Sequence, residues 1–262
     1  MIKALINNQW ESIPEENLQL GADTFSYEVG LYETFRTLDF KPVFLAGHLN
    51  RLFKSSKKIN LNIPYSQSNI SKMLIKVIQD FPAPNQRVRI LAVPNELIIY
   101  SSHLNLNQKI YEGISAITVE AFRDNPHLKT TNYHACLNAW KLANDAGCFE
   151  AILMNKHGII FEGSRSNIFW IKNKKLFTRA DGVLPGITRQ TILNLSPYPV
   201  EFGILHIENI NEINECFLTN SGSGIIPVTQ INGENIGDGS VGTVTKQLLA
   251  QYNNWILQDI TG

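Results

Sequence analysis

The sequence predicts an α+β protein of two domains, a small N-terminal domain over residues 1–112 and a larger C-terminal domain over residues 113–262. Short stretches of alternating apolar and polar residues recur along the chain and are typical of strands. A few longer amphipathic stretches, typical of helices, interrupt them. The length of 262 residues suits one large domain or two smaller ones that share an interface. No internal repeat or long linker separates independent modules.

The first domain opens with strand-like sequence at KALINNQW and again over residues 26–48, where a hairpin is expected at 39–42. Apolar residues repeat on one helical face over residues 48–59, which predicts a helix. A second amphipathic helix is expected after a cap at Ser66 or Ser68. Two further strands, RVRILAVP and ELIIYSSHL, complete a domain of mostly antiparallel strands.

The second domain starts near GISAITVEAF, which reads as a buried strand. A polar stretch, RDNPHLKTTN, leads to a helix that is expected to end at Gly147. Four short strands follow, EAILMN, GIIFEG, NIFWIK and KLFT. A Pro-Gly pair precedes a predicted helix in DGVLPGITRQTILNL, and the chain closes with strands, a hairpin at Asn232-Gly233 and a helix over about 241–256.

Composition disfavours several functional classes. Lysine plus arginine equals aspartate plus glutamate at 23 each, whereas a nucleic-acid-binding protein normally carries a basic excess. The N-terminus lacks the apolar core of a signal peptide, and no run reaches transmembrane length. The three cysteines show neither CxxC nor zinc spacing and suit buried thiols in a reducing compartment. A cytoplasmic protein with no membrane or nucleic-acid partner is therefore expected.

The familiar catalytic motifs are absent from the sequence. NSGSGIIP follows a strand but lacks the third glycine of a dinucleotide fingerprint, and GDGSVGTVTK lacks the Gly-Lys-Ser/Thr of a phosphate loop. There is no HExxH and no GxSxG. Neither a metal site nor a serine-hydrolase mechanism is expected.

Lys129 lies in a polar stretch directly before a predicted helix, in HLKTTNYHACLNAW. A lysine that attacks a carbonyl must be deprotonated, so it needs a pKa lowered by burial or by nearby positive potential. The exposed N–H groups in the first turn of a helix supply part of that potential. The alternative interpretation is an ordinary solvated lysine in a loop.

Three features are typical of phosphate binding. GITR opens a predicted helix, so the N–H groups of Ile187 and Thr188 lack intrahelical partners and can hold an anion. In FLTNSGSG, Asn220 and Ser221 end a strand in a hydroxyl-rich turn, and Arg51 in HLNRL adds a positive charge suited to bidentate contacts. A helix cap, a polar turn and a solvated arginine are the alternative interpretations.

A carboxylate and a phenol complete the set. Glu162 interrupts the apolar strand IIFEG, and a buried carboxylate needs a cationic partner or a protonated ring nitrogen. The alternatives are an outward-facing strand residue and a strand terminus. Tyr133 offers a hydroxyl to a phenolate-like oxygen, or is a core tyrosine at a helix start. A lysine, a phosphate cradle, a carboxylate and a phenol are the groups that hold pyridoxal 5'-phosphate, which together they predict as the cofactor.

The chain resembles the fold-type IV pyridoxal-phosphate enzymes, the class IV aminotransferase family, over nearly its whole length. The resemblance rests on the order and spacing of KTTNY, GCFEAILMNKHGIIFEGSRSNIFWIKNKKLFT, LPGITRQTIL and FLTNSGSGIIPV. The family includes branched-chain aminotransferases, D-amino-acid aminotransferases and 4-amino-4-deoxychorismate lyases. It implies a cofactor in the cleft between a small N-terminal and a larger C-terminal domain, a homodimer, and a small-molecule amine substrate.

The resemblance also implies a role for each candidate residue. Lys129 matches the Schiff-base lysine, and Glu162 matches the partner of the pyridine nitrogen. Tyr133 matches the residue that meets the ring oxygen in branched-chain members. The phosphate ligands would be Arg51, Ile187, Thr188 and Ser221, with Asn220 beside them.

The motifs leave the reaction open. FLTNSGSGIIPV and the three residues between Lys129 and Tyr133 resemble the lyases, whereas GCFEAIL is close to D-amino-acid aminotransferases. The leading interpretation is a 4-amino-4-deoxychorismate lyase-like enzyme that forms 4-aminobenzoate and pyruvate. Arg36 and Arg89 are candidates for binding substrate carboxylates or are strand-surface arginines, and Arg165 is a weaker candidate for the same role. The alternatives are a branched-chain or D-amino-acid aminotransferase and a non-catalytic ligand-binding relative.

Overall fold

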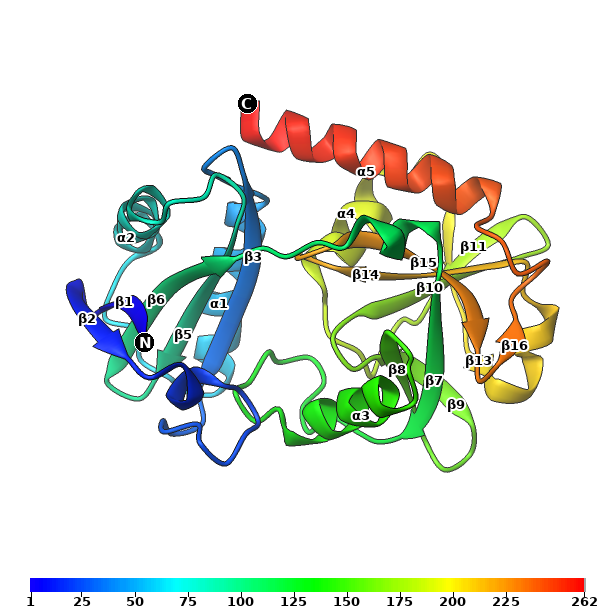
Figure 1. The fold of residues 1–262 in the computed structure, drawn as a ribbon, viewed down its shortest axis with the longest axis horizontal. Coiled ribbons are helices and arrows are strands. Elements are labelled where there is room, and N and C mark those ends of the chain that lie inside the picture. The colour runs from blue at the N-terminus through cyan, green and yellow to red at the C-terminus, as the bar shows by residue number, and fades with distance from the viewer. Residues whose placement is uncertain (262) are drawn as a thin grey trace. The chain divides into compact units, whose positions relative to one another are not determined.

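The computed structural model describes residues 1–261 and groups them into two compact units (Figure 1). The first comprises Met1–Asn105, Leu128–His134 and the segment that begins at Ile256; the second comprises Leu106–His127 and Ala135–Trp255. Both units contain helices and a sheet, which confirms the predicted α+β class. Among the described residues, no helix combines the length and the apolar character that a membrane crossing requires.

The predicted domain boundary at residues 112 and 113 differs from these units in three segments: residues 106–112 belong to the second unit, and Leu128–His134 and the segment that begins at Ile256 belong to the first. It assigns Leu128–His134 to the second domain, whereas the structure groups this segment with the first unit. The reason is backbone pairing, because the N–H of Tyr32 donates to the carbonyl of Lys129 at 2.9 Å. Compact units are defined by contacts and not by independent folding, so the division into domains stays a prediction.

The first unit is organised around a six-stranded sheet in the order β2-β1-β6-β5-β3-β4, with every neighbouring pair antiparallel. This confirms the predicted strand direction. The predicted hairpin at 39–42 is also confirmed: Asp39 and Phe40 both have positive φ between β3 and β4. The strands are β1 (Ile2–Ile6), β2 (Gln9–Ile13), β3 (Leu31–Leu38), β4 (Lys41–Pro42), β5 (Gln86–Val93) and β6 (Glu96–His103).

The two faces of this sheet have different coverings. Helices α1 (Leu45–Lys58) and α2 (Gln67–Asp80) pack on one face, against apolar residues such as Phe35 and Ile90. The short 3-10 helix η1 (Glu15–Leu18) contributes to the cluster on the other face, with Tyr32 and Tyr100. Since side chains alternate along a strand, successive residues of β3 point to opposite faces of the sheet. That alternation decides which of them belong to the candidate site.

The two helices of this unit begin in different ways. Helix α2 begins after Ser66, which forms a capping box with Asn69, so Ser66 and not Ser68 is the cap. Helix α1 begins at Leu45, ahead of the predicted start at residue 48. There, no local side chain caps the helix, and the N–H of Phe44 donates to Oδ2 of Asp259 at 2.6 Å.

The second unit is organised around a ten-stranded mixed sheet in the order β12-β11-β10-β14-β15-β7-β8-β9-β13, with β16 paired to β15. Three pairs are parallel, β11 with β12, β15 with β7 and β7 with β8, and the others are antiparallel. The strands are β7 (Ile114–Glu120), β8 (Glu150–Met154), β9 (Ile159–Gly163), β10 (Asn167–Lys172), β11 (Lys175–Thr178), β12 (Val200–Phe202), β13 (Leu205–His206), β14 (Glu215–Asn220), β15 (Gly224–Ile231) and β16 (Glu234–Asn235).

The predicted helices of the second half of the chain are confirmed. Helix α3 (His134–Asp145) ends before Gly147, whose φ is +71°, and α4 (Ile187–Leu195) follows the Pro-Gly pair and packs against β14. Helix α5 (Thr243–Thr261) extends past the predicted end at residue 256. Two 3-10 helices, η2 (Gln108–Glu112) and η3 (Ile207–Glu212), connect strands.

Candidate active site

Lys129 is positioned by strand pairing and not by the helix that follows it. The segment around it runs antiparallel to the start of β3: Tyr32 donates to the Lys129 carbonyl at 2.9 Å, and the N–H of Thr131 donates to the carbonyl of Gly30 at the same distance. The Thr131 hydroxyl accepts the N–H of Gly30 at 2.8 Å. Helix α3 begins only at His134, so the helix-start argument for Lys129 is replaced by anchoring to a sheet.

The side chain of Lys129 is half-buried against aromatic rings, so the solvated-loop interpretation does not hold. Its Nζ lies 4.3 Å from the centroid of the Tyr32 ring, within cation–π distance. Tyr133 meets the same ring edge-on, with centroids 6.1 Å apart. The structure therefore brings two predicted residues, Lys129 and Tyr133, together around Tyr32.

Arg89 on β5 faces the same aromatic group. Its Nε donates to the Thr34 hydroxyl and its Nη1 to the Tyr100 hydroxyl, both at 3.3 Å, and its Cζ lies 5.7 Å from the Tyr32 ring centroid. Burial opposes its charge, but the phenol oxygens of Tyr100 and Tyr32 outweigh burial and raise the pKa of Arg89. No carboxylate of the described residues forms an ion pair with Arg89. A half-buried guanidinium held by hydroxyls suits an external carboxylate.

The other two arginine candidates differ from Arg89. Arg36 lies on β3 directly opposite Arg87 of β5, on the face of the sheet that carries Thr34 and Arg89. Arg165 belongs to the second unit and is exposed; its Nη2 donates to the carbonyl of Phe149 at 3.0 Å, and its Cζ lies 4.7 Å from the Trp140 ring. These contacts make Arg165 the weakest of the three candidates.

Arg51 on α1 is a buried ion-pair partner and not a solvated arginine. Its exposed fraction is 9%, and it donates from Nε and Nη2 to the two carboxylate oxygens of Glu33 at 2.7 and 2.6 Å. Nδ1 of His48 lies 2.7 Å from Oε2 of the same carboxylate. Burial raises the energy of the Glu33 charge, but Arg51 and His48 outweigh that and lower the pKa of Glu33 to about 2.

In the second unit, Glu162 is buried at the end of β9, so the outward-facing interpretation is wrong. Nη1 of Arg123 lies 3.1 Å from its Oε1. Its Oε2 accepts hydrogen bonds from Nδ2 of Asn167 and from the N–H of Leu184, both at 3.0 Å. Three donors thus keep this carboxylate in place.

The start of helix α4 has the features of an anion site. Its N-cap, Gly186, has no side chain to accept the first amides, and Gln190 donates to the Gly186 carbonyl at 2.8 Å. The amides of Ile187 and Thr188 come before Gln190 in the first turn of the helix, where amides have no intrahelical acceptor. The buried hydroxyl of Thr188 lies 3.1 Å from the Tyr252 hydroxyl.

The turn between β14 and β15 is shaped by Asn220. Its Oδ1 accepts the N–H groups of Gly222 at 3.0 Å and Ser223 at 2.7 Å, and Ser221 lies half-buried within the turn. Just before it, the hydroxyl of Thr219 is buried and has no hydrogen-bond partner among residues 1–261. The predicted polar turn is therefore a folded loop with an unused buried hydroxyl at its base.

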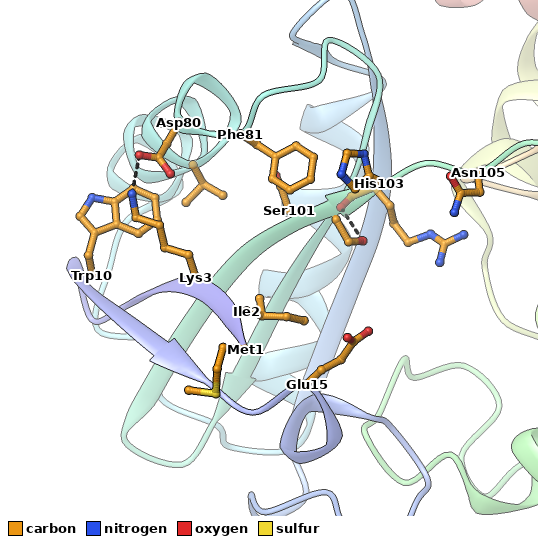
Figure 2. A pocket seen from close by; sticks show the side chains of 13 residues that line it. Met1, Ile2, Lys3, Trp10, Glu15, Asp80, Phe81, Ser101, His103 and Asn105 are labelled. Atoms are coloured by element: carbon orange, nitrogen blue, oxygen red, sulfur yellow. Dashed lines mark hydrogen bonds and ion pairs between the residues drawn. The ribbon is translucent and has the colours of Figure 1, made fainter.

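A separate pocket of about 460 Å³ lies in the first unit (Figure 2). Lys3 points to Asp80, with an N–O distance of 2.6 Å, and lies 4.4 Å from the Trp10 ring centroid. Phe81 and His103 pack edge to face on another part of its wall. None of the candidate site residues lines this pocket, and the charge of Lys3 already has a partner within it.

Several residues of these clusters have no role in the sequence-based prediction, among them Tyr32, Glu33, His48 and Arg123. Two of them carried a signal. Glu33 is an acidic residue within an apolar strand pattern, and His48 lies three residues before Arg51 on one helical face. Their partners, however, lie on other elements, and a single sequence does not show that pairing.

Comparison with known proteins decides the family. The family model for amino-transferase class IV matches residues 30–231. The chain belongs to this family. A probable branched-chain-amino-acid aminotransferase of Thermotoga maritima is 29% identical over 243 residues, 88% of either chain. A D-alanine aminotransferase of Staphylococcus epidermidis is 25% identical over 280 residues, 98% of either chain.

The solved structures confirm the fold-type IV architecture. The branched-chain amino acid aminotransferase of Escherichia coli matches with a TM-score of 0.85 at 23% identity, and the match covers 97% of this chain and 94% of that one. Another branched-chain amino acid aminotransferase, determined with pyridoxamine 5'-phosphate, matches with a TM-score of 0.83 at 21% identity over 96% of this chain and 93% of its own. Class IV aminotransferases use pyridoxal 5'-phosphate, so the predicted cofactor is confirmed.

The donor sets of this chain fit the cofactor. The second unit offers amide donors at an N-cap without a side chain, the buried carboxylate of Glu162, and the buried hydroxyl of Thr219, which has no hydrogen-bond partner in the described part of the chain. The first unit offers Lys129, Tyr133 and the buried guanidinium of Arg51. An aldehyde, a phosphate and a pyridine nitrogen each find a matching group in these sets.

Proposed function

We propose that the chain is an amino-acid aminotransferase in which Lys129 acts on the substrate amine and Arg89 binds its carboxylate. The observation that carries this proposal is that both cations lie against one ring, that of Tyr32, at 4.3 and 5.7 Å from its centroid. An α-amino acid carries its amine and its carboxylate on the same carbon. A lysine and a guanidinium beside one ring suit those two ends.

The named relatives support an aminotransferase over a lyase, since those given above are branched-chain and D-alanine aminotransferases. This reverses the order of the sequence-based interpretation, which placed the lyase first. Aminodeoxychorismate lyase is the second candidate because Arg36 lies on the same face as Arg89. Two arginines suit a substrate with two carboxylates.

Pyridoxal phosphate, when bound, withdraws electrons from the substrate carbon next to the nitrogen. In the proposed mechanism, Nζ of Lys129 would hold the cofactor before the substrate arrives. It would then take the proton from that carbon and deliver it to the cofactor carbon on the other side of the nitrogen, the 1,3-proton shift that transamination requires. Tyr133 donates a hydrogen bond to the ring oxygen of the cofactor. Arg89 orients the substrate by its carboxylate, so that the proton to be moved faces Lys129.

The remaining candidate residues hold the cofactor. Glu162 accepts a hydrogen bond from the ring nitrogen and thereby favours its protonated form. The amides of Ile187 and Thr188, together with Arg51 and Ser221, bind the phosphate. Asn220 acts by shaping the turn that carries Ser221, since its Oδ1 already accepts two backbone amides.

We also propose a homodimer, on the family resemblance alone. Sedimentation velocity on the purified holoprotein is expected to show a species of twice the 29.5 kDa chain mass. A monomer at micromolar concentration would contradict it.

The experiment that tests the function is a cofactor-conversion assay. The purified holoprotein is mixed with L-amino acids, D-amino acids or aminodeoxychorismate, and the cofactor released by denaturation is analysed by chromatography. We expect an amino acid to convert it stoichiometrically to pyridoxamine phosphate. Formation of 4-aminobenzoate from aminodeoxychorismate, with no conversion by any amino acid, would refute the aminotransferase and support the lyase.

A further inference from the structure

The ion pair between Arg51 and Glu33 fixes the plane of the guanidinium. Nε and Nη2 of Arg51 meet Oε1 and Oε2 of Glu33 at 2.7 and 2.6 Å, which is the side-on bidentate arrangement. In this arrangement, Nη1 points away from Glu33, because it lies on the opposite side of the guanidinium carbon. The carboxylate therefore determines the direction in which Arg51 presents its remaining donors.

His48 supports the carboxylate from the preceding turn of α1. Its Nδ1 lies 2.7 Å from Oε2 of Glu33, and its ring packs against Phe35 with centroids 5.3 Å apart. Burial lowers the pKa of His48, and the positive charges of Arg51 and Lys129 act in the same direction. A neutral ring that donates from Nδ1 thus braces Glu33 without adding charge.

Neither long-range attraction of a phosphate nor the stability of the fold explains why Arg51 is paired with Glu33. Glu33 places a negative charge beside the cation that is to attract a phosphate, which weakens long-range attraction. A buried ion pair also contributes little net stability compared with a well-packed apolar pair. What Glu33 does provide is a guanidinium whose orientation is set before any ligand binds, and this reduces the ordering that binding requires.

We propose that Glu33 and His48 are positioning residues that orient Arg51 and thereby set the affinity of the chain for the phosphate group of its cofactor. This inference rests on the proposed function, in which Arg51 binds that phosphate. It assigns a task to two residues that hold Arg51 in place: His48, one turn before Arg51 on α1, and Glu33 on β3, which packs against that helix.

The test compares two ligands that differ only in the phosphate. Cofactor-free protein is titrated with pyridoxal 5'-phosphate and with pyridoxal, and binding is followed by absorption in the visible range. Glu33→Gln, which keeps the shape but removes the charge, is expected to weaken pyridoxal phosphate binding by about tenfold, roughly 1.4 kcal/mol, while pyridoxal changes less than about twofold. Arg51→Lys, which cannot form the bidentate pair, should lose at least as much.

The histidine is tested by a matched pair of variants. The phosphate preference is the ratio of the affinity for pyridoxal 5'-phosphate to the affinity for pyridoxal. His48→Asn keeps a donor near the position of Nδ1 and should retain most of this ratio, whereas His48→Leu should lower it several-fold. Glu215→Gln is the control, because Glu215 is a carboxylate of the second unit that accepts the amides of Val244 and Thr245. It is expected to leave both affinities unchanged. If Glu33→Gln does not fold, Glu33→Asp retains the charge while shortening the reach, and should show a smaller phosphate-specific loss.

The possible outcomes separate this inference from the proposed function. If Arg51→Lys loses the phosphate preference and both Glu33 variants keep it, the positioning role is refuted while the cofactor assignment stands. An equal loss for pyridoxal and its phosphate would show that Glu33 has only a structural role. If the unaltered chain shows no preference for the phosphorylated ligand, the role of Arg51 in the proposed function fails, and the positioning role fails with it.

Discussion

Gly186 provides the sharpest test of how the second unit holds its candidate residues. Its φ and ψ are −62° and 141°, an extended conformation that alanine adopts without strain. On backbone grounds alone, Gly186→Ala is expected to stabilise the chain by about 0.4–1 kcal/mol. A Cβ at this position, however, would come within 3.0 Å of Oδ1 of Asn167, closer than real Cβ contacts. The Asn167 side chain is buried and must move.

Moving Asn167 breaks two hydrogen bonds. Its Nδ2 donates to Oε2 of Glu162 at 3.0 Å and to the carbonyl of Leu184 at 2.9 Å. Oε2 of Glu162 keeps the N–H of Leu184, and the Leu184 carbonyl keeps the N–H of Gly186, so the loss falls on the buried Nδ2 of Asn167. An unsatisfied buried donor costs about 1–3 kcal/mol, so the free energy of unfolding should fall by roughly 2 kcal/mol. The cost of displacing Asn167 therefore exceeds the gain from restricting the unfolded backbone, and Gly186→Ala is expected to destabilise the folded chain.

Urea titration followed by tryptophan fluorescence measures the change, because Trp140, Trp170 and Trp255 all lie in the second unit. Gly222→Ala is the control, since its Cβ would meet only Oδ1 of Asn220 at an ordinary 3.4 Å. In an Asn167→Ala background, Gly186→Ala should cost much less, because the overlapping amide is gone. A Gly186→Ala variant as stable as the unaltered chain would refute the reasoning.

Three further predictions concern the proposed site. Lys129→Ala should abolish the covalent attachment of the cofactor after borohydride reduction, as measured by intact-mass spectrometry; attachment that persists would remove Lys129 from its role. Arg89→Met should raise the KM for the amino acid by about tenfold or more, since a charge-assisted pair is lost; Arg87→Met, exposed on the same strand, is the control, and an unchanged KM would contradict the assignment. The pKa of Glu33, about 2 against its ordinary 4.5, implies that protonating this carboxylate lowers the stability of the folded chain by roughly 3 kcal/mol relative to the charged form. That contribution is complete above pH 4.5 and is lost as the pH falls toward 2, so Glu33→Gln should flatten this part of the acid-denaturation curve, and equal slopes would count against it.

Local chemistry accounts for the elements that the sequence predicts well. The capping box at Ser66 and Asn69, the end of α3 before Gly147 and the turn at Asn232 and Gly233 all depend on residues within a few positions of one another. Such signals are visible in the sequence because their partners are adjacent in it. The start of α1 is the contrasting case: the N–H of Phe44 is satisfied by Asp259, 215 residues away, and local sequence contains no trace of that contact.

The candidate residues show the same division. Their types and spacing are sufficient to predict the cofactor, because aldehyde, phosphate and ring nitrogen each require a particular functional group. They do not show whether each residue is buried. Glu162 and Arg51 are buried and paired, with partners on other elements or across a loop. Among the arginines, the sequence-based interpretation already placed Arg165 behind Arg36 and Arg89. The structure shows how their surroundings differ, since Arg165 donates to the Phe149 carbonyl and Arg89 to hydroxyl groups.

The sequence by itself determined the α+β class, the order of most elements and the chemistry of the cofactor, because periodicity, turn residues and functional groups act over short distances. Only the tertiary structure decided that Lys129 is anchored to β3, that Arg89 and Lys129 share the ring of Tyr32, and that Glu33 is paired with Arg51. These relations join segments that are separated in the chain. They follow from strand register and side-chain alternation, which determine the face of a sheet on which each residue lies.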